Sequence, residues 1–235
     1  MPTRARPDAD TVLDRLRGGL IASCQPVDDG PMDHPGIVAA MAAAVVRGGA
    51  AGVRIEGIAN LRAARARVEV PIIGLIKRDL PDSPVRITAM IEDARALIAA
   101  GADIIAYDAT ERPRPTPPDQ VLAAILAAGR IAMADCATLD DGHRARAGGA
   151  AIIGTTLSGY TAGTEGLHDG PDFDLIAALR RRDPGFIMAE GRFNTPGLAA
   201  RALREGADAV TVGSALTRLE HVTGWFAEAI RGARP

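Results

Sequence analysis

Two ionisable residues, Lys77 and Glu190, each end an otherwise apolar run of the sequence. Lys77 completes Pro-Ile-Ile-Gly-Leu-Ile-Lys at 71–77, and Glu190 completes Phe-Ile-Met-Ala-Glu at 186–190. If these runs are buried strands, desolvation lowers the pKa of the lysine and raises the pKa of the carboxyl group. Both shifts suit a general acid or base near neutral pH. The pair therefore predicts proton transfer; the alternative is a structural Lys–Glu ion pair, because ion pairs also contain perturbed groups.

A second group of residues is suited to binding a phosphate. Gly191 and Arg192 directly follow the glutamate, and Gly213 and Ser214 follow another apolar run. Glycine lets an anion approach backbone N–H groups closely. Arg192 or Arg218 can add a planar cationic fork. We predict a phosphate site here; the alternative is that the glycines only relieve crowding.

A short motif of glycine and alanine recurs in the sequence and identifies the elements that must position these residues. Each copy follows an alanine-rich helical pattern and begins a short apolar run. The copies start at Gly48, Gly101, Gly148 and Gly206. This pattern is typical of the junction between a helix and a buried strand. Four more apolar runs alternate with these four, at 19–24, 72–77, 131–135 and 186–190. Eight strands alternating with helices predict an α/β fold, a (β/α)8 TIM barrel, in a single domain over residues 1–235.

The barrel determines where the polar residues meet. Functional residues of this fold lie at the C-terminal ends of the strands. Strands three and seven lie opposite each other in a ring of eight, so Lys77 and Glu190 are expected to face a common substrate from two sides. That geometry suits removal of a proton from one face of a carbon and its return on the other. We expect helices at 11–16, 31–47, 58–68, 87–99, 118–128, 139–147, 173–182 and 219–231, and one beginning at 194–196.

Other charged or polar residues also end predicted strands. Arg54 and Asp135 are candidates for binding substrate hydroxyls or an acetamido group. Alternatively, they pair with each other or with the glutamate that ends the same strand as Arg54. Gln25 is expected to be a hydrogen-bonding contact rather than a catalyst. Asp108 is expected to orient the lysine rather than to contact substrate.

Two loops that follow predicted strands are long enough to cover a site. These are 79–86, which contains proline, and 158–171, which is rich in glycine. Loops after strands lie on the catalytic face of a barrel. We therefore expect these two to be candidate lids. Residues 1–17 are expected to form an N-terminal extension or a helix that closes the other end.

Length and composition exclude several classes of protein. The chain has 235 residues, a net charge of −2 and an isoelectric point of about 6.1, which argues against a nucleic-acid partner. No apolar run reaches about 18 residues, so no membrane segment is expected. Residues 1–10 lack the apolar centre of a signal peptide. With only Cys24 and Cys136, a disulfide framework is not expected, and a cytoplasmic location is favoured.

No metal site is predicted. Metal-binding histidines usually occur at characteristic spacings from other ligands. The four histidines show no such spacing: His34, His143, His168 and His221.

Seven stretches of the chain together resemble a known enzyme family. They are 19–26 (GLIASCQP), 53–57 (VRIEG), 71–79 (PIIGLIKRD), 108–115 (DATERPRP), 154–161 (GTTLSGYT), 189–196 (AEGRFNTP) and 212–218 (VGSALTR). On these motifs the chain resembles the N-acetylmannosamine-6-phosphate 2-epimerases of bacterial sialic-acid catabolism, from about Gly18 to Ile230. Ala22 and Leu216 are minor departures. The approach to the fifth predicted strand, at 128–130, is short.

The resemblance implies an activity and a set of roles. It implies interconversion of N-acetylmannosamine 6-phosphate and N-acetylglucosamine 6-phosphate through an enediolate, without a cofactor. Lys77 and Glu190 would transfer protons, the loops at Gly191 and Gly213 would hold the phosphate, and the remaining contacts would come from Gln25, Arg54, Asp135 and Arg218.

Two other functions compete with this prediction. A Schiff-base aldolase also uses a lysine at the mouth of a barrel. A barrel that only binds a phosphosugar would not need the acid–base pair. The small-molecule phosphosugar is the expected ligand, and a homodimer is left open.

Overall fold

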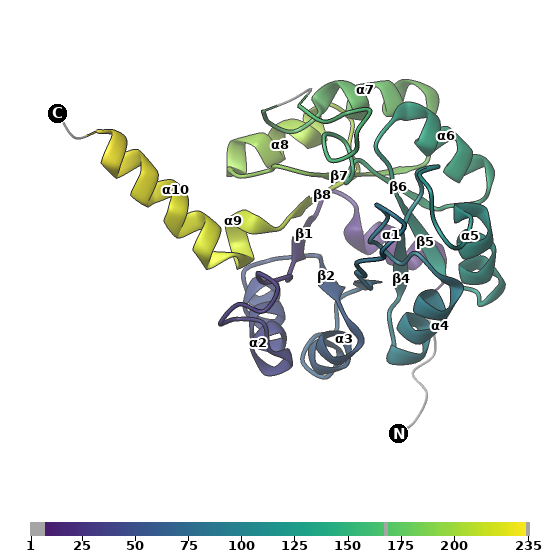
Figure 1. Ribbon diagram of the computed structural model, residues 1–235, viewed down its shortest axis with the longest axis horizontal. Coiled ribbons are helices and arrows are strands. Elements are labelled where there is room, and N and C mark those ends of the chain that lie inside the picture. Colours follow the sequence, from purple (N-terminus) through teal and green to yellow (C-terminus); the bar gives the residue numbers. More distant parts are fainter. Residues whose placement is uncertain (1–7, 167–168, 234–235) are drawn as a thin grey trace.

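Eight parallel strands close into a barrel and follow one another around it in sequence order (Figure 1). The computed structural model describes residues 8–166 and 169–233. The strands are β1 (Leu20–Ser23), β2 (Gly52–Glu56), β3 (Ile72–Leu75), β4 (Ile104–Asp108), β5 (Ile131–Asp135), β6 (Ile152–Gly154), β7 (Phe186–Glu190) and β8 (Ala209–Val212). β8 pairs with β1 and completes the ring. The predicted single-domain (β/α)8 barrel is confirmed.

The helices alternate with the strands. They are α1 (Ala9–Leu16), α2 (Pro35–Arg47), α3 (Ile58–Arg65), α4 (Ile91–Ala100), α5 (Pro118–Ala127), α6 (Leu139–Ala147), α7 (Phe173–Arg182), α8 (Pro196–Arg204), α9 (Ser214–Thr217) and α10 (Leu219–Gly232). The ranges predicted for α6 and α7 match the structure, and the helix predicted to begin at 194–196 is α8.

Two predicted helices begin later than expected. α2 starts at Pro35 and not at 31, because the imidazole of His34 caps it and accepts a hydrogen bond from the Gly36 N–H at 3.1 Å. α4 starts at Ile91 and not at 87. The chain at 87–88 still pairs with the segment after β3, where the Thr88 N–H donates to the Ile76 carbonyl at 2.7 Å.

Alternate positions of the strands pack on opposite sides of the barrel wall. Inward side chains such as Ile73, Ile104 and Met133 form one buried cluster. Val12 and Leu16 of α1 belong to that cluster, so α1 packs across the N-terminal end of the barrel, as a barrel-closing helix would. The limits of the domain remain a prediction, and residues 1–7 lie outside the described part of the chain.

Two aspartates brace the N-terminal end of the barrel. Asp103 accepts a hydrogen bond from the Ile72 N–H at 2.9 Å and Asp208 accepts one from the Ile187 N–H at 2.8 Å. Each thus ties the start of its own strand to the neighbouring strand, while arginines neutralise both. Because this end of the fold serves stability, the chemistry is to be sought at the opposite end.

The last helix, α10, leaves the barrel. Figure 1 shows it extending away from the wall that α2 to α8 surround. None of its residues is buried, and Leu219, Phe226 and Ile230 are 56%, 68% and 62% exposed. Within residues 8–166 and 169–233, no helix is long and apolar enough to cross a membrane.

Candidate active site

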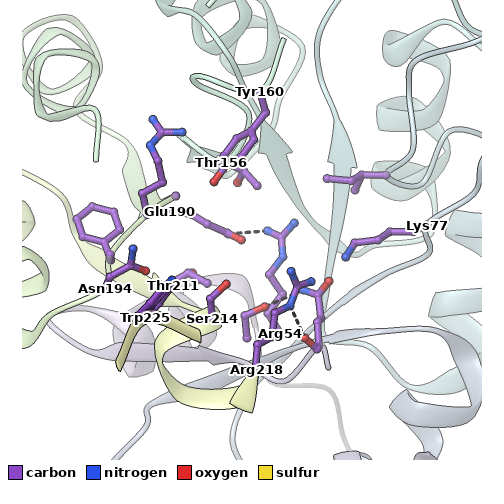
Figure 2. A pocket seen from close by; sticks show the side chains of 17 residues that line it. Arg54, Lys77, Thr156, Tyr160, Glu190, Asn194, Thr211, Ser214, Arg218 and Trp225 are labelled. Carbon is purple, nitrogen blue, oxygen red and sulfur yellow. Dashed lines mark hydrogen bonds and ion pairs between the residues drawn. The ribbon is translucent and has the colours of Figure 1, made fainter. Parts of the chain in front are cut away.

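A cavity of about 290 Å³ opens at the C-terminal end of the barrel, where the predicted residues meet. Nine of the ten residues predicted from the sequence line it: Gln25, Arg54, Lys77, Glu190, Gly191, Arg192, Gly213, Ser214 and Arg218. The tenth, Asp135, is fully buried beneath them. Figure 2 shows Lys77 and Glu190 pointing into the cavity from opposite sides, with the end of Arg54 between them in this view.

Arg54, on β2, is 1% exposed and holds two carboxylates in place. Its Nη1 and Nη2 donate to Asp135 at 3.0 Å and 2.7 Å, and Nη1 also donates to Glu190 Oε2 at 2.8 Å. Thr156 Oγ1 donates to the same aspartate at 2.6 Å. Of the sequence alternatives, the pairing of Arg54 with Asp135 is therefore observed, in the bidentate form that fixes guanidinium geometry.

Glu190 is placed so that it can carry a proton. Burial raises its pKa from 4.5 to about 7, while the Arg54 cation opposes the shift and the Asp135 carboxylate adds to it. The backbone is fixed as well, because the Glu190 N–H donates to Thr155 Oγ1 at 3.0 Å and its carbonyl accepts from the same hydroxyl at 2.9 Å. A carboxyl group with such a pKa can gain and lose a proton at physiological pH.

Lys77 lies two residues beyond β3, in a short antiparallel bridge with Ile87. Its N–H donates to Glu56 Oε1 at 3.2 Å. Burial lowers the pKa of its amine, and the nearby cations of Arg218 and Arg54 add to the effect. The ion pair of Glu190 is formed with Arg54 rather than with Lys77, so a simple Lys–Glu bridge does not account for either residue.

The prediction that Asp108 orients Lys77 is wrong. The carboxylate of Asp108 accepts hydrogen bonds from Thr110 Oγ1 and Arg114 Nη2, both at 2.6 Å, and forms an ion pair with Arg112. The two arginines follow Asp108 within one short segment and turn back onto it. Asp108 therefore organises the loop after β4.

Two glycines lie at the ends of β7 and β8, where a phosphate site is predicted, and both line the cavity. Gly191 has φ +113°, a region that residues with side chains rarely adopt. At Gly213, a Cβ atom would contact the side chain of Ser23 at 3.4 Å. Ser214 follows at the start of α9. Gly191 therefore needs glycine for its backbone conformation, whereas a Cβ at Gly213 would make only an ordinary contact.

The sequence offers Arg192 or Arg218 as the cationic fork for the phosphate. In the structure, the Arg192 guanidinium binds the loop after β6. Nε donates to the Gly170 carbonyl at 2.7 Å and Nη1 donates to the Ser158 carbonyl at 3.0 Å. The guanidinium also lies 5.0 Å from the centre of the Tyr160 ring. Arg192, just after the end of β7, is therefore hydrogen-bonded to the loop at 158–171 that was predicted to be a lid. Residues 167–168, including His168, lie outside the described residues.

Arg218 and Gln25 lie together at the start of α10. Arg218 Nε donates to the Gln25 carbonyl at 3.0 Å, and Gln25 Nε2 donates to Ser23 Oγ at 2.7 Å. This contact uses the Nε atom and holds the guanidinium at the cavity that Arg218 lines. Arg218 is therefore the better candidate for the cationic fork.

Sequence reasoning assigned no role to several residues that the structure brings to the cavity. They are Ser23, Ile87, Thr156, Tyr160, Phe193, Asn194, Thr211 and Trp225. Thr156 could have been found, since it follows β6 as the other site residues follow their strands. Trp225 could not, because it lies on a helix that ordinarily packs outside the barrel.

The described residues contain no group of three or more His, Cys, Asp or Glu side chains placed to hold a metal ion. What they do hold is a lysine with a lowered pKa and a glutamate with a raised pKa on two sides of one cavity, and a buried arginine between two carboxylates. Fold and site together are those of a (β/α)8 enzyme.

Comparisons with known proteins identify the family. A family model described as "Putative N-acetylmannosamine-6-phosphate epimerase" matches residues 38–232. The chain belongs to this family of epimerases. Two curated relatives described as "Putative N-acetylmannosamine-6-phosphate 2-epimerase" come from Photobacterium profundum, 58% identical over 92% of this chain and 91% of the relative, and from Haemophilus influenzae, 55% identical over 95% and 96%.

One solved structure of an epimerase is similar along nearly the whole chain, and a more distant structure shares only the fold. The N-acetylmannosamine-6-phosphate 2-epimerase from Clostridium perfringens superposes with a TM-score of 0.91 at 35% identity, over 97% of this chain and 100% of that one. Thiamine phosphate pyrophosphorylase from Pyrococcus furiosus matches with a TM-score of 0.59 at 14% identity, over 86% and 88%, and shares the barrel fold alone.

Proposed function

We propose that this protein interconverts N-acetylmannosamine 6-phosphate and N-acetylglucosamine 6-phosphate, without a cofactor, in the cytoplasmic breakdown of sialic acid and related amino sugars. The observation that carries the proposal is the approach of Lys77 and Glu190 to one cavity from opposite sides. The family relationship supports the choice of substrate.

The reaction is a proton exchange at C2 of the open-chain sugar. C2 lies next to the aldehyde, so its C–H bond is acidified by the carbonyl. One of Lys77 and Glu190 removes the proton, and the other returns a proton to the opposite face. The intermediate is an enediolate-type anion; it is strictly an enolate, because C2 carries nitrogen. Arg54, held between the two carboxylates, supplies a fixed cation for the charge that develops on O1.

The experiment that tests the function is incubation of the protein with either 6-phosphate in deuterated water, with no added cofactor. Proton NMR should show the other epimer appearing, with deuterium at C2 and at no other carbon. If Lys77 and Glu190 act on opposite faces of C2, every product molecule should carry deuterium at C2. Substantial unlabelled product in a single turnover would instead assign both proton transfers to one residue, and no conversion would refute the proposed function.

The 6-phosphate group is expected to be essential for efficient turnover. Gly191, Gly213 and Ser214 lie at one end of the cavity, and binding energy gained there supports chemistry at C2. Unphosphorylated N-acetylmannosamine should therefore show kcat/KM at least about a thousandfold lower. Steady-state assays of the two sugars make the comparison. Similar kcat/KM values would show that the phosphate site is misassigned.

The partner we propose is a second copy of the chain, bound through α10. Leu219, Val222, Phe226 and Ile230 recur at helical spacing and form one apolar stripe, and exposed apolar surfaces of this kind mark interfaces. In a (β/α)8 barrel the last helix covers the wall beside the last and first strands. Partly buried apolar residues lie at or beside these strands, among them Leu20, Leu198 and Ala215. Every copy carries them, so α10 of one copy can cover the wall of another with two-fold symmetry.

Introducing charge on this stripe is expected to separate the dimer. The double variant Phe226→Glu, Ile230→Glu should elute at the monomer mass, while the wild type has twice that mass in light scattering. His221→Glu places the same charge on the opposite face of α10 and should remain dimeric. A monomeric wild type, or a dimeric double variant, would contradict the proposed interface.

A further inference from the structure

Ile87 is a fixed apolar wall next to the catalytic lysine. Its backbone bridges that of Lys77, and its carbonyl accepts a hydrogen bond from the Asp108 N–H at 3.1 Å. The side chain is 8% exposed and packs in the barrel cluster with Leu75. Because both neighbouring strand ends hold it, Ile87 presents a rigid surface to the cavity that it lines.

Ile87 differs chemically from the other residues that line the cavity. Among the described residues that line the cavity, Ile87 is the only one with an aliphatic side chain. Other apolar lining residues, such as Phe193 and Trp225, come from the segments after β7 and β8, where we place the phosphate. Around Lys77, the cavity is otherwise lined by polar groups such as Gln25 and Arg54.

The proposed reaction fixes how the substrate lies against these walls. With Lys77 and Glu190 on the two faces of C2, the three other substituents of the planar intermediate lie between them. C3 leads toward the phosphate, and O1 lies toward the Arg54 cation. The acetamido group leaves C2 on the third side of that plane, and its methyl group is the only part of the substrate with no polar atom attached. Ile87, held between the segment after β3 and the end of β4, is the one aliphatic side chain that the described cavity lining offers to it.

We propose that Ile87 forms the wall against which the methyl group of the acetamido substituent packs, and that it sets the size of the N-acyl group that the enzyme accepts. This inference rests on the proposed function. A methyl group gains affinity only from apolar contact, and a rigid wall excludes longer acyl chains.

The test compares N-acetyl and N-propionyl mannosamine 6-phosphate as substrates. The wild type should prefer the acetyl substrate by at least about tenfold in kcat/KM, the effect of one methylene group in a close-fitting pocket. Ile87→Ala should raise the propionyl-to-acetyl ratio of kcat/KM by about tenfold or more. Ile87→Val, which preserves the packing, should raise the ratio by a smaller factor.

The matched control is Ile76→Ala. Ile76 precedes Lys77 and packs on the outer side of the barrel wall, away from the cavity. This variant should leave the ratio unchanged. If both Ile87 variants epimerise the acetyl substrate with the wild-type ratio, the inference is overturned while the proposed function stands. If the wild type converts neither substrate, the function itself fails.

Discussion

Glu190→Gln is expected to lower kcat at least about a hundredfold, the usual contribution of a general acid or base. Glutamine keeps the size of the side chain and its contact with Arg54, but it cannot exchange a proton. The kcat/KM profile of the wild type should contain an ionisation near pH 7, because burial places the pKa of Glu190 there. Steady-state assays from pH 5 to pH 9 should show that this ionisation is absent in the variant.

The raised pKa of Glu190 also predicts that the Glu190→Gln variant folds well. The pKa of Glu190 lies above its ordinary value of 4.5, so the folded state favours the protonated form. Stability from this group is fully present below pH 4.5 and is lost as the pH rises through about 7. A glutamine is neutral throughout, so at pH 8 the Tm of Glu190→Gln should equal or exceed that of the wild type.

A surface carboxylate provides the control. Glu205 lies after α8 and forms an exposed ion pair with Arg201, so Glu205→Gln should keep wild-type turnover. Near-normal turnover in Glu190→Gln, with the Tm preserved, would remove Glu190 from the mechanism. A loss of activity accompanied by a lower Tm at pH 8 would show that its role is structural.

The barrel could be predicted because four junctions between a helix and a strand repeat one local signal, and four further apolar runs alternate with them. The glycine at Gly101 adopts φ +97° and ends α4, as the recurring motif indicated. The helix starts were harder to predict. Residues at 87–88 fit a helical pattern by composition, but they pair with the end of β3, a contact distant in sequence that no local pattern reveals.

The site was predictable to the extent that it follows from strand order. Lys77 follows β3 by two residues and Glu190 ends β7, and topology places these two strands opposite each other, so their meeting required no knowledge of side-chain conformation. The hydrogen-bond partners of the arginines could not be predicted from strand order. Arg192 and Arg218 both border the cavity, yet one guanidinium binds loop carbonyls and the other contacts Gln25. Such choices depend on loop conformation.

The course of α10 was not predictable from its sequence. Its apolar stripe is typical of any helix that covers a barrel, and α2 has apolar residues of the same kind. Whether the stripe packs on its own barrel or on another copy depends on the direction in which the chain leaves α9. That direction also brings Trp225 to the cavity.

The choice of lysine at position 77 carries information of its own. Lys77 is the only lysine in a chain with 27 basic residues, so the other 26 are arginines. Arginine retains its proton in proteins, whereas a buried lysine can release one near neutral pH. Substituting Lys77→Arg is therefore expected to lower kcat by about a thousandfold or more although the positive charge is kept, and Lys77→Met should be equally impaired. Activity in Lys77→Arg would show that charge alone is required.

The role of Lys77 also separates the epimerase from the aldolase. An aldolase would form an imine between Lys77 and the sugar carbonyl, which borohydride reduces to a stable amine. An epimerase uses the same amine only to move a proton. Because the chain contains one lysine, the mass of the intact protein after treatment with substrate and borohydride reports on this side chain, with peptide mapping to exclude the terminal amine. We expect no added mass on Lys77 and no two-carbon or three-carbon fragments, since Glu190 supplies the second proton-transfer group that imine chemistry does not require. A reduced sugar adduct on Lys77 would replace the epimerase mechanism with an aldolase mechanism.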